Sequence, residues 1–208
     1  MSYLSKPARG FVLGTFMPPH AGHVYLCDFA RAYVGELTIL VCSLPDDAIP
    51  GALRFAWMRE LFPGARVVHC EEVLPQLPED DPENFWPIWR DVIRRYHPEP
   101  IDVVFAAEAY GQRLAKETDS RFVPVDEART AFPVSAKQIR KDPYAYWRFL
   151  PGPVRPYYLK RVTLFGAEST GKTTLAAQLA RHFNTVVAPE YGRFHTEAFG
   201  AGAATPED

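Results

Sequence analysis

The chain has 208 residues, 47% of them hydrophobic, and its formal net charge at pH 7 is -2. These values are typical of a globular protein with one full domain and a smaller second one, and they lack the excess of basic residues that binds nucleic acid. The sequence shows neither an apolar signal segment nor a run of membrane-spanning length, so we expect a cytoplasmic protein without a membrane partner. The cysteines, which lack metal-ligand spacing, are expected to be reduced core residues: Cys27, Cys42 and Cys70.

Apolar segments of strand length alternate along the chain with amphipathic segments of helix length. We predict strands at residues 11–16, 37–42, 66–70, 101–106, 121–125 and 162–165, and helices at 23–33, 51–62, 84–96, 110–117, 135–141, 143–149 and 172–183. The strands are apolar throughout, which indicates an α/β fold with a Rossmann-like parallel sheet covered by helices on both faces. Ligands of such sheets bind at the carboxyl ends of the strands.

The segment between the first predicted strand and helix reads GTFMPPHAGH, residues 14–23. It places His20 and His23 one helical turn apart at a helix start, where free backbone N–H groups and the helix dipole attract anions. Both imidazoles can then donate hydrogen bonds to phosphoryl oxygens. Histidines at this spacing are more often surface or core residues, but the preceding G-x-F-x-P pattern makes a chance match rare. We therefore predict a phosphate site here.

A proline-rich segment, residues 151–156, marks a domain boundary, because its three prolines cannot continue a helix or a central strand. We divide the chain into a first domain, residues 1–155, and a second part, residues 156–208. The second part begins with a predicted strand, the P-loop pattern G-x-x-x-x-G-K-[ST] at residues 166–173, and an amphipathic helix. This order of elements is the context that the P-loop pattern requires.

The P-loop pattern predicts a second phosphate site, formed by the backbone between Gly166 and Gly171 and by the residues that follow: Lys172, Thr173 and Thr174. Lys172 would reach the β- and γ-phosphates, and the Thr173 hydroxyl would ligate Mg²⁺. Beyond the helix we predict one short strand, 185–188, followed by a PEYGR segment at 189–193 that fits either a site or a solvated loop. A kinase needs further acidic and lid residues, so we expect an incomplete P-loop domain.

Other residues of the first domain can complete the site at residues 14–23. Ser135 is a good N-cap whose hydroxyl can also reach a phosphate, and Arg140 lies on the same short predicted helix. Further candidates follow two predicted strands at the expected ligand edge of the sheet: Glu108, Asp126 and Arg129. Trp86 and Trp89 could stack on a flat ring, with apolar helix packing as the alternative.

GTFMPPHAGH at residues 14–23 and VSAKQIR at 134–140 resemble the two signatures of nucleotidyltransferases that carry an HxGH motif. With the P-loop downstream, the motif order resembles the NadR-type bifunctional proteins, which join a nicotinamide-nucleotide adenylyltransferase to a ribosylnicotinamide kinase. The resemblance implies an enzyme of NAD biosynthesis. In the implied reaction, the 5′-phosphate of nicotinamide mononucleotide attacks the α-phosphorus of ATP in the presence of Mg²⁺, and NAD and pyrophosphate form.

The same resemblance implies roles for the candidate residues. His20, His23 and Arg140 would be the catalytic residues that hold the ATP phosphates and stabilise the developing charge. The other nucleotide-binding residues would be Gly14, Thr15, Phe16, Ser135, Glu108, Asp126 and Arg129. Trp86 or Trp89 would contact the nicotinamide ring.

Three other functions remain open at this point. An adenylyl- or cytidylyltransferase for another phosphate would share the first motif but not explain the P-loop. A P-loop kinase or ATPase with an accessory nucleotide-binding domain would use the second motif instead. A non-catalytic module could bind ATP and NAD as a sensor. The residues also leave open the amide or acid form of the mononucleotide and the formation of a homo-oligomer.

Overall fold

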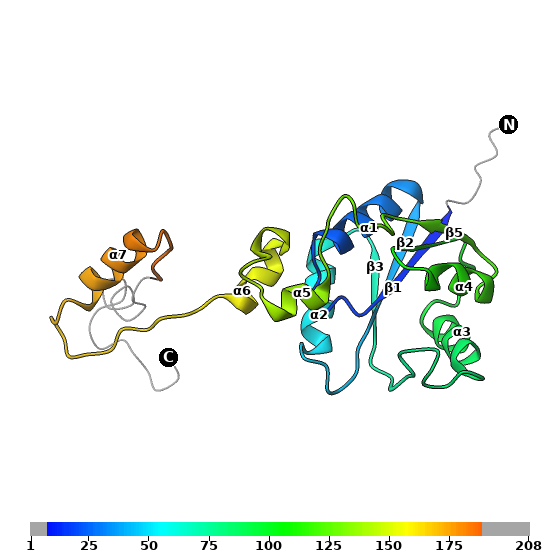
Figure 1. Cartoon of the computed structure of the whole chain (residues 1–208), viewed down its shortest axis with the longest axis horizontal. Helices are drawn as coiled ribbons and strands as arrows, with labels where there is room; N and C mark the ends of the chain where they lie inside the picture. Colours follow the sequence, from blue (N-terminus) through cyan, green and yellow to red (C-terminus); the bar gives the residue numbers. More distant parts are fainter. Residues whose placement is uncertain (1–7, 189–208) are drawn as a thin grey trace, which may run out of the picture. The chain divides into compact units, whose positions relative to one another are not determined.

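The structure of the chain, a computed structural model, describes residues 8–188 (Figure 1). It contains two compact units that divide between Leu159 and Lys160. The first unit holds the sheet and residues 14–23, which we call the histidine turn. The second unit begins shortly before the P-loop. The two units are described separately below.

A sheet of five parallel strands forms the centre of the first unit, in the order β3-β2-β1-β4-β5. The strands are β1 (Arg9–Gly14), β2 (Glu36–Cys42), β3 (Arg66–Cys70), β4 (Val103–Ala106) and β5 (Arg121–Pro124). The predicted α/β fold with a parallel sheet is therefore confirmed. The β3 prediction agrees with the structure to the residue, and the other four differ by a few residues at their ends.

Helices cover both faces of this sheet: α1 (Ala21–Tyr33), α2 (Gly51–Leu61), α3 (Phe85–Tyr96) and α4 (Tyr110–Glu117). Successive residues of β1 point to opposite faces. Phe11 packs in the apolar cluster of α3 and α4, Val12 packs in the cluster of α1 and α2, and both are fully buried. Because both faces are buried, the strands read as continuous apolar runs.

A third apolar cluster joins α2, α5 (Ala136–Lys141) and the proline-rich segment: Ile49, Trp57, Val134, Ile139, Leu150 and Val154. The proline-rich segment continues no preceding helix, but it contains short helices of its own, which we did not predict. It forms a 3₁₀ turn at Gly152–Val154 and the short helix α6 (Arg155–Tyr158). Pro153 and Pro156 fit because they stand in the first turn of each helix, where no backbone donor is needed.

The predicted helix at residues 143–149 is wrong. Only Trp147–Phe149 is helical, as a single 3₁₀ turn. The Asp142 carboxylate accepts hydrogen bonds from the backbone N–H groups of Tyr144, at 3.2 Å, and Ala145, at 3.0 Å. Such a side-chain turn offers the backbone an alternative to the helix ladder, and a periodic apolar pattern alone does not reveal it.

The described part of the second unit contains one helix, α7 (Lys172–His182), and no strand. The predicted strands at 162–165 and 185–188 are therefore wrong. Val162 is 80% exposed and Phe165 is 89% exposed, because no neighbouring strand lies within this described segment to pair with them. The PEYGR segment at 189–193 lies outside the described residues. Across residues 8–188, no helix combines the length and apolar character needed to cross a membrane.

The strand order indicates where the sheet would bind a ligand, at the carboxyl end of β1. After β3 the chain returns to the other side of β1 and continues with β4 and β5. The carboxyl ends of β1 and β4 therefore form a topological switch point, where open α/β sheets bind their ligands. The histidine turn leaves β1 at this point and leads into α1.

Candidate functional site

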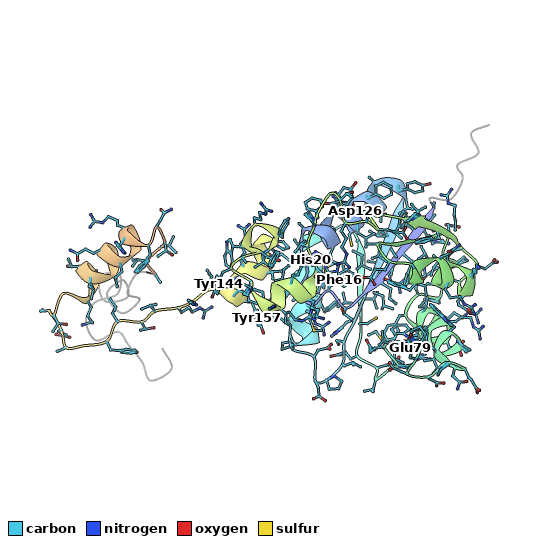
Figure 2. The ribbon with its side chains drawn as sticks, in the orientation of Figure 1. Phe16, His20, Glu79, Asp126, Tyr144 and Tyr157 are labelled. Carbon is cyan, nitrogen blue, oxygen red and sulfur yellow. The ribbon has the colours of Figure 1, made fainter. Side chains whose placement is uncertain are left out.

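His20, labelled beside Phe16 in Figure 2, is the N-cap of α1, and its own ring caps the helix. Its backbone is extended, and Nδ1 accepts a hydrogen bond from the Gly22 N–H at 3.1 Å. Since Nδ1 is an acceptor, a neutral His20 ring carries its proton on Nε2. The first turn of α1 thus combines backbone N–H groups with an imidazole N–H donor, which suits an anion.

His23 lies directly on His20. Their ring centroids are 3.8 Å apart with an interplanar angle of 30°. The Phe16 ring packs edge-on against His23, with 5.0 Å between the two ring centroids. Phe16 is buried and has a φ of 46°, a left-handed conformation that an aromatic residue rarely adopts. His23 Nδ1 is buried, and it has no hydrogen-bond partner within residues 8–188. The turn therefore holds a polar atom that a ligand or solvent has to satisfy.

Both imidazoles are neutral at pH 7. Burial, and next the nearby Arg129 charge, lower the pKa of His20 to about 4. Burial, then the charges of His20 and Arg129, hold the pKa of His23 well below its usual value. The stacked pair therefore offers hydrogen bonds to an incoming phosphate as neutral imidazoles.

Helix α5 meets the histidine turn through Arg140. The Arg140 guanidinium donates a hydrogen bond to the Met17 carbonyl, three residues before His20. Ser135 caps α5 in a capping box with Gln138, accepting from the Gln138 N–H at 3.3 Å while its own N–H donates to Gln138 Oε1 at 2.8 Å. The structure thus brings Arg140 to the turn, whereas the recorded bonds of Ser135 lie within its own helix.

The residues predicted to bind nucleotide after β4 and β5 have two roles in the structure. Glu108 and Arg129 form an ion pair, and Asp126 holds the loop between β5 and α5. Arg129 is ion-paired with Glu108 at 3.0 Å, and its charge acts on His20 and His23. Asp126 accepts backbone hydrogen bonds from Thr130, Ala131 and Phe132. Desolvation raises the pKa of Asp126, but these hydrogen bonds outweigh it and the net shift is downward. Asp126 therefore shapes the loop that carries Arg129.

Both tryptophans pack in the cluster of α3 and α4. Trp89 is 6% exposed, and its Nε1 donates to the Pro75 carbonyl at 3.0 Å. Trp86 is partly buried, with its ring 5.0 Å from that of Phe85 and the Arg113 guanidinium 5.6 Å away. The histidine turn joins the opposite cluster through Phe16. This packing supports the apolar alternative for Trp86 and Trp89, and their role at a nicotinamide ring stays a prediction.

Arg54 was absent from the sequence-based set of residues. It is fully buried in α2, and its guanidinium donates to carbonyl oxygens from both sheet and loop: Cys42, at 3.1 Å, Ile49, at 2.9 Å, and Thr15. Its charge is paired with Asp47. Through Thr15 and Cys42 it ties together the carboxyl ends of β1 and β2. An arginine within the apolar segment GALRFAWMREL was the available signal, but arginines on helices are mostly exposed.

The P-loop residues lie at the start of α7. Gly171 has a φ of 83° and forms the N-cap, a conformation that favours glycine. Lys172 Nζ donates to the carbonyls of Gly166, at 3.0 Å, and Ala167, at 2.7 Å, so the amine lies over the loop. Thr173 and Thr174 are exposed on the first turn of the helix. The predicted phosphate and Mg²⁺ contacts of this loop stay predictions.

Known proteins resemble this chain in both sequence and structure. A family model described as an AAA domain matches residues 161–206. The trifunctional NAD biosynthesis/regulator protein NadR of Escherichia coli (strain K12) is 32% identical in an alignment 210 positions long, gaps included, that covers 90% of this chain and 50% of that protein. Crystal structures of NadR with NAD and AMP-PNP, and of NadR with NR, are each 28% identical with a TM-score of 0.73. These matches cover 97% and 93% of this chain, and 61% and 57% of the NadR chains.

The chain is homologous to NadR. The homology extends over both the histidine turn and the P-loop, because the matches cover nearly the whole chain. The chain spans about half the length of the curated NadR proteins that it matches. The second unit is further matched by the AAA model, which includes the P-loop.

Proposed function

We propose that the first unit is a nicotinamide mononucleotide adenylyltransferase, which transfers AMP from ATP to nicotinamide mononucleotide. The observation that carries this proposal is the stacked pair at the start of α1, buried His20 and partly buried His23, with Arg140 bound to the same turn. The homology to a protein named for NAD biosynthesis supports the substrate class. A solved NadR structure that contains NAD and AMP-PNP supports both nucleotides.

The proposed chemistry needs position and charge rather than a base. The attacking phosphate of the mononucleotide is already anionic at neutral pH, so no side chain has to remove a proton from it. The N–H groups of His20 and of the α1 start would bind ATP phosphates, and Arg140 would stabilise the charge on the departing pyrophosphate. Arg129 and Glu108 would border the same nucleotide site.

Mg²⁺ would enter with ATP as part of the substrate. Within the described residues, no group of three or more His, Cys, Asp or Glu side chains is placed to hold a metal ion. We expect phosphates and water to carry the Mg²⁺, with few protein ligands. In the second unit, the exposed Thr173 hydroxyl would be the corresponding ligand.

The test is incubation of the full chain with ATP, Mg²⁺ and nicotinamide mononucleotide, followed by mass spectrometry of the products. We expect equal amounts of NAD and pyrophosphate. Parallel reactions with nicotinic acid mononucleotide and with CTP would determine the acceptor and the nucleotide. Binding of ATP and NAD without pyrophosphate would contradict catalysis and favour a sensor.

A second proposed function is nucleotide binding at the P-loop, supported by the AAA match and by Lys172 at the loop carbonyls. We expect K172A to remove nucleotide binding by the second unit while NAD synthesis by the first stays within about twofold. R181A, which removes another cation from the same helix, is the control. Loss of NAD synthesis in K172A alone would instead indicate that the P-loop carries the main activity.

A further inference from the structure

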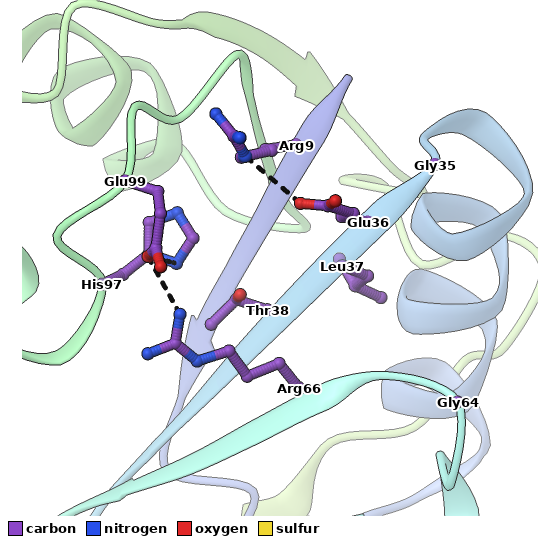
Figure 3. Close-up of a pocket in the computed structure, with 9 residues that line it drawn as sticks. All are labelled: Arg9, Gly35, Glu36, Leu37, Thr38, Gly64, Arg66, His97 and Glu99. Atoms are coloured by element: carbon purple, nitrogen blue, oxygen red, sulfur yellow. Dashed lines mark hydrogen bonds and ion pairs between the residues drawn. The ribbon is translucent and has the colours of Figure 1, made fainter. Parts of the chain in front are cut away.

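A cavity of about 390 Å³ lies at the amino-terminal edge of the sheet (Figure 3). Arg9, Glu36 and Arg66, the first residues of β1, β2 and β3, line it together with Thr38, His97 and Glu99. β1 runs from this edge to the histidine turn over a length of about 17 Å at its usual rise per residue. The cavity is therefore separate from the proposed adenylyltransferase site.

His97 is the most informative residue of this cavity. It is 5% exposed, and neither Nδ1 nor Nε2 has a hydrogen-bond partner among residues 8–188. Glu99 Oε2 lies 3.7 Å from Nδ1, which is too far for a hydrogen bond. Because buried polar atoms are nearly always paired with a protein group or with water, an unpaired imidazole beside a cavity needs a polar partner from water or from a ligand.

His97 is a neutral donor and acceptor at pH 7. Burial lowers its pKa, and this effect outweighs the opposing charge of Glu99. A neutral ring presents one N–H donor and one nitrogen lone pair. It therefore matches a ligand group that both accepts and donates, such as a carboxamide or a hydroxyl.

The remaining side chains carry balanced charge. Arg9 Nε is 3.2 Å from Glu36 Oε2, and Arg66 Nη1 is 2.9 Å from Glu99 Oε2. Figure 3 shows these two ion pairs on different sides of Thr38. Two cations and two anions therefore border the cavity, and they are partly exposed rather than enclosed in the core.

We propose that this cavity binds a small zwitterion of the free amino acid class, with a carboxylate, an ammonium group and a polar side chain. A carboxylate would accept from Arg9 and Arg66, and an ammonium group would donate to Glu36 and Glu99. A simple anion would face the two glutamates, and a simple cation would face the two arginines, so each would lose part of its binding energy to repulsion. The polar side chain would pair with His97 once its ring turns toward the cavity, because both ring nitrogens are buried.

L-Glutamine is the probe, because its carboxamide suits His97 and its backbone is a zwitterion. Binding to the full ¹⁵N-labelled chain would be followed through the His97 ring nitrogens in long-range ¹H–¹⁵N spectra, with a titration to about 10 mM. Two analogues each lack one charge: glutaramate has no ammonium group, and 4-aminobutanamide has no carboxylate. We expect saturable shifts with L-glutamine and at least about tenfold weaker binding of either analogue.

Two variants test the residues. H97F keeps a ring against Phe11, whose centroid is 5.7 Å from that of His97, and removes both nitrogens, so we expect binding to be lost. R66Q should weaken binding at least about tenfold. Its matched control is R31Q, since Arg31 is similarly exposed and is ion-paired with Asp28 at 3.1 Å, and this variant should bind within about twofold of the parent.

Three results would overturn the proposal. The first is the absence of saturable His97 shifts with L-glutamine. The second is equal binding of L-glutamine and the two singly charged analogues, which would indicate a site without zwitterion recognition. The third is unchanged binding of L-glutamine in R66Q. This result would overturn the proposal even if circular dichroism shows that H97F does not fold. None of these outcomes depends on NAD synthesis.

Discussion

His20 is neutral in the folded protein, with a pKa of about 4 against an ordinary value of 6.5. In the unfolded chain the ring regains the ordinary pKa and binds a proton more readily. Between about pH 6.5 and pH 4 the unfolded state therefore holds more protons, and the free energy of unfolding falls as the pH decreases. The contribution is fully present above this window, and on the order of 3 kcal/mol is lost at its lower end.

We therefore expect H20N to reduce the pH dependence of stability between pH 7 and pH 4. Asparagine can still accept from the Gly22 N–H as an N-cap, but it does not titrate. Urea denaturation at a series of pH values measures the change. The slope should shrink rather than vanish, because His23 also titrates with a lowered pKa. An identical slope in H20N and the parent chain would show that His20 is not protonated on unfolding.

The ring of His23 has a separate consequence for activity. If His23 donates to the phosphates of ATP, H23A removes one preorganised donor and should lower kcat for NAD synthesis about 10²- to 10³-fold. The exposed His182 offers the matched control, and H182A should keep the parent rate. Steady-state rates together with circular dichroism separate this effect from unfolding. Near-normal turnover in a folded H23A would falsify the assignment.

At the scale of elements, Arg54 connects the ends of two strands with the loop before α2. Its removal would take the guanidinium donor from three backbone carbonyls, and it would leave the mostly buried Asp47 with only the Leu44 N–H. We expect R54L to lower the free energy of unfolding by about 3–5 kcal/mol, as for other buried ion pairs that lose one partner. R59L, an exposed arginine on the same helix, should change it by less than about 0.5 kcal/mol. Equal effects in urea denaturation would contradict the bridging role of Arg54.

The same elements show what could be read from the sequence. The strands and most helices of the first unit follow from local apolar patterns, since burial on both sheet faces leaves a continuous apolar run. His20 and His23 could be found because they are neighbours in the chain. The reach of Arg140 to Met17 and of Arg54 to Thr15 spans many residues, and local patterns carry no signal for it. Residues 162–165 show the converse error, since an apolar segment forms a strand only beside a partner.

At the scale of the whole molecule, the two units differ in how much apolar surface they bury. The first has three clusters of buried side chains. In the described part of the second, α7 has 11 residues and none is buried, while Leu175 and Phe183 are 47% and 67% exposed. A helix of this length without packed side chains is marginal in water.

We therefore expect hydrogen exchange to divide the chain into two classes. Amides of β1 and β2 should exchange only through global unfolding, because they lie in the centre of the sheet. Amides of α7 should exchange close to the rate of an unstructured peptide, apart from those held by its N-terminal turn. Mass spectrometry of peptic fragments at several times measures both classes at once. Helix α1 of the first unit serves as a helical reference, since Leu26, Cys27 and Ala30 anchor it in the core. Protection of α7 equal to that of α1 would mean that its apolar face is covered in solution, and adding ATP would then show whether the P-loop ligand is what orders it.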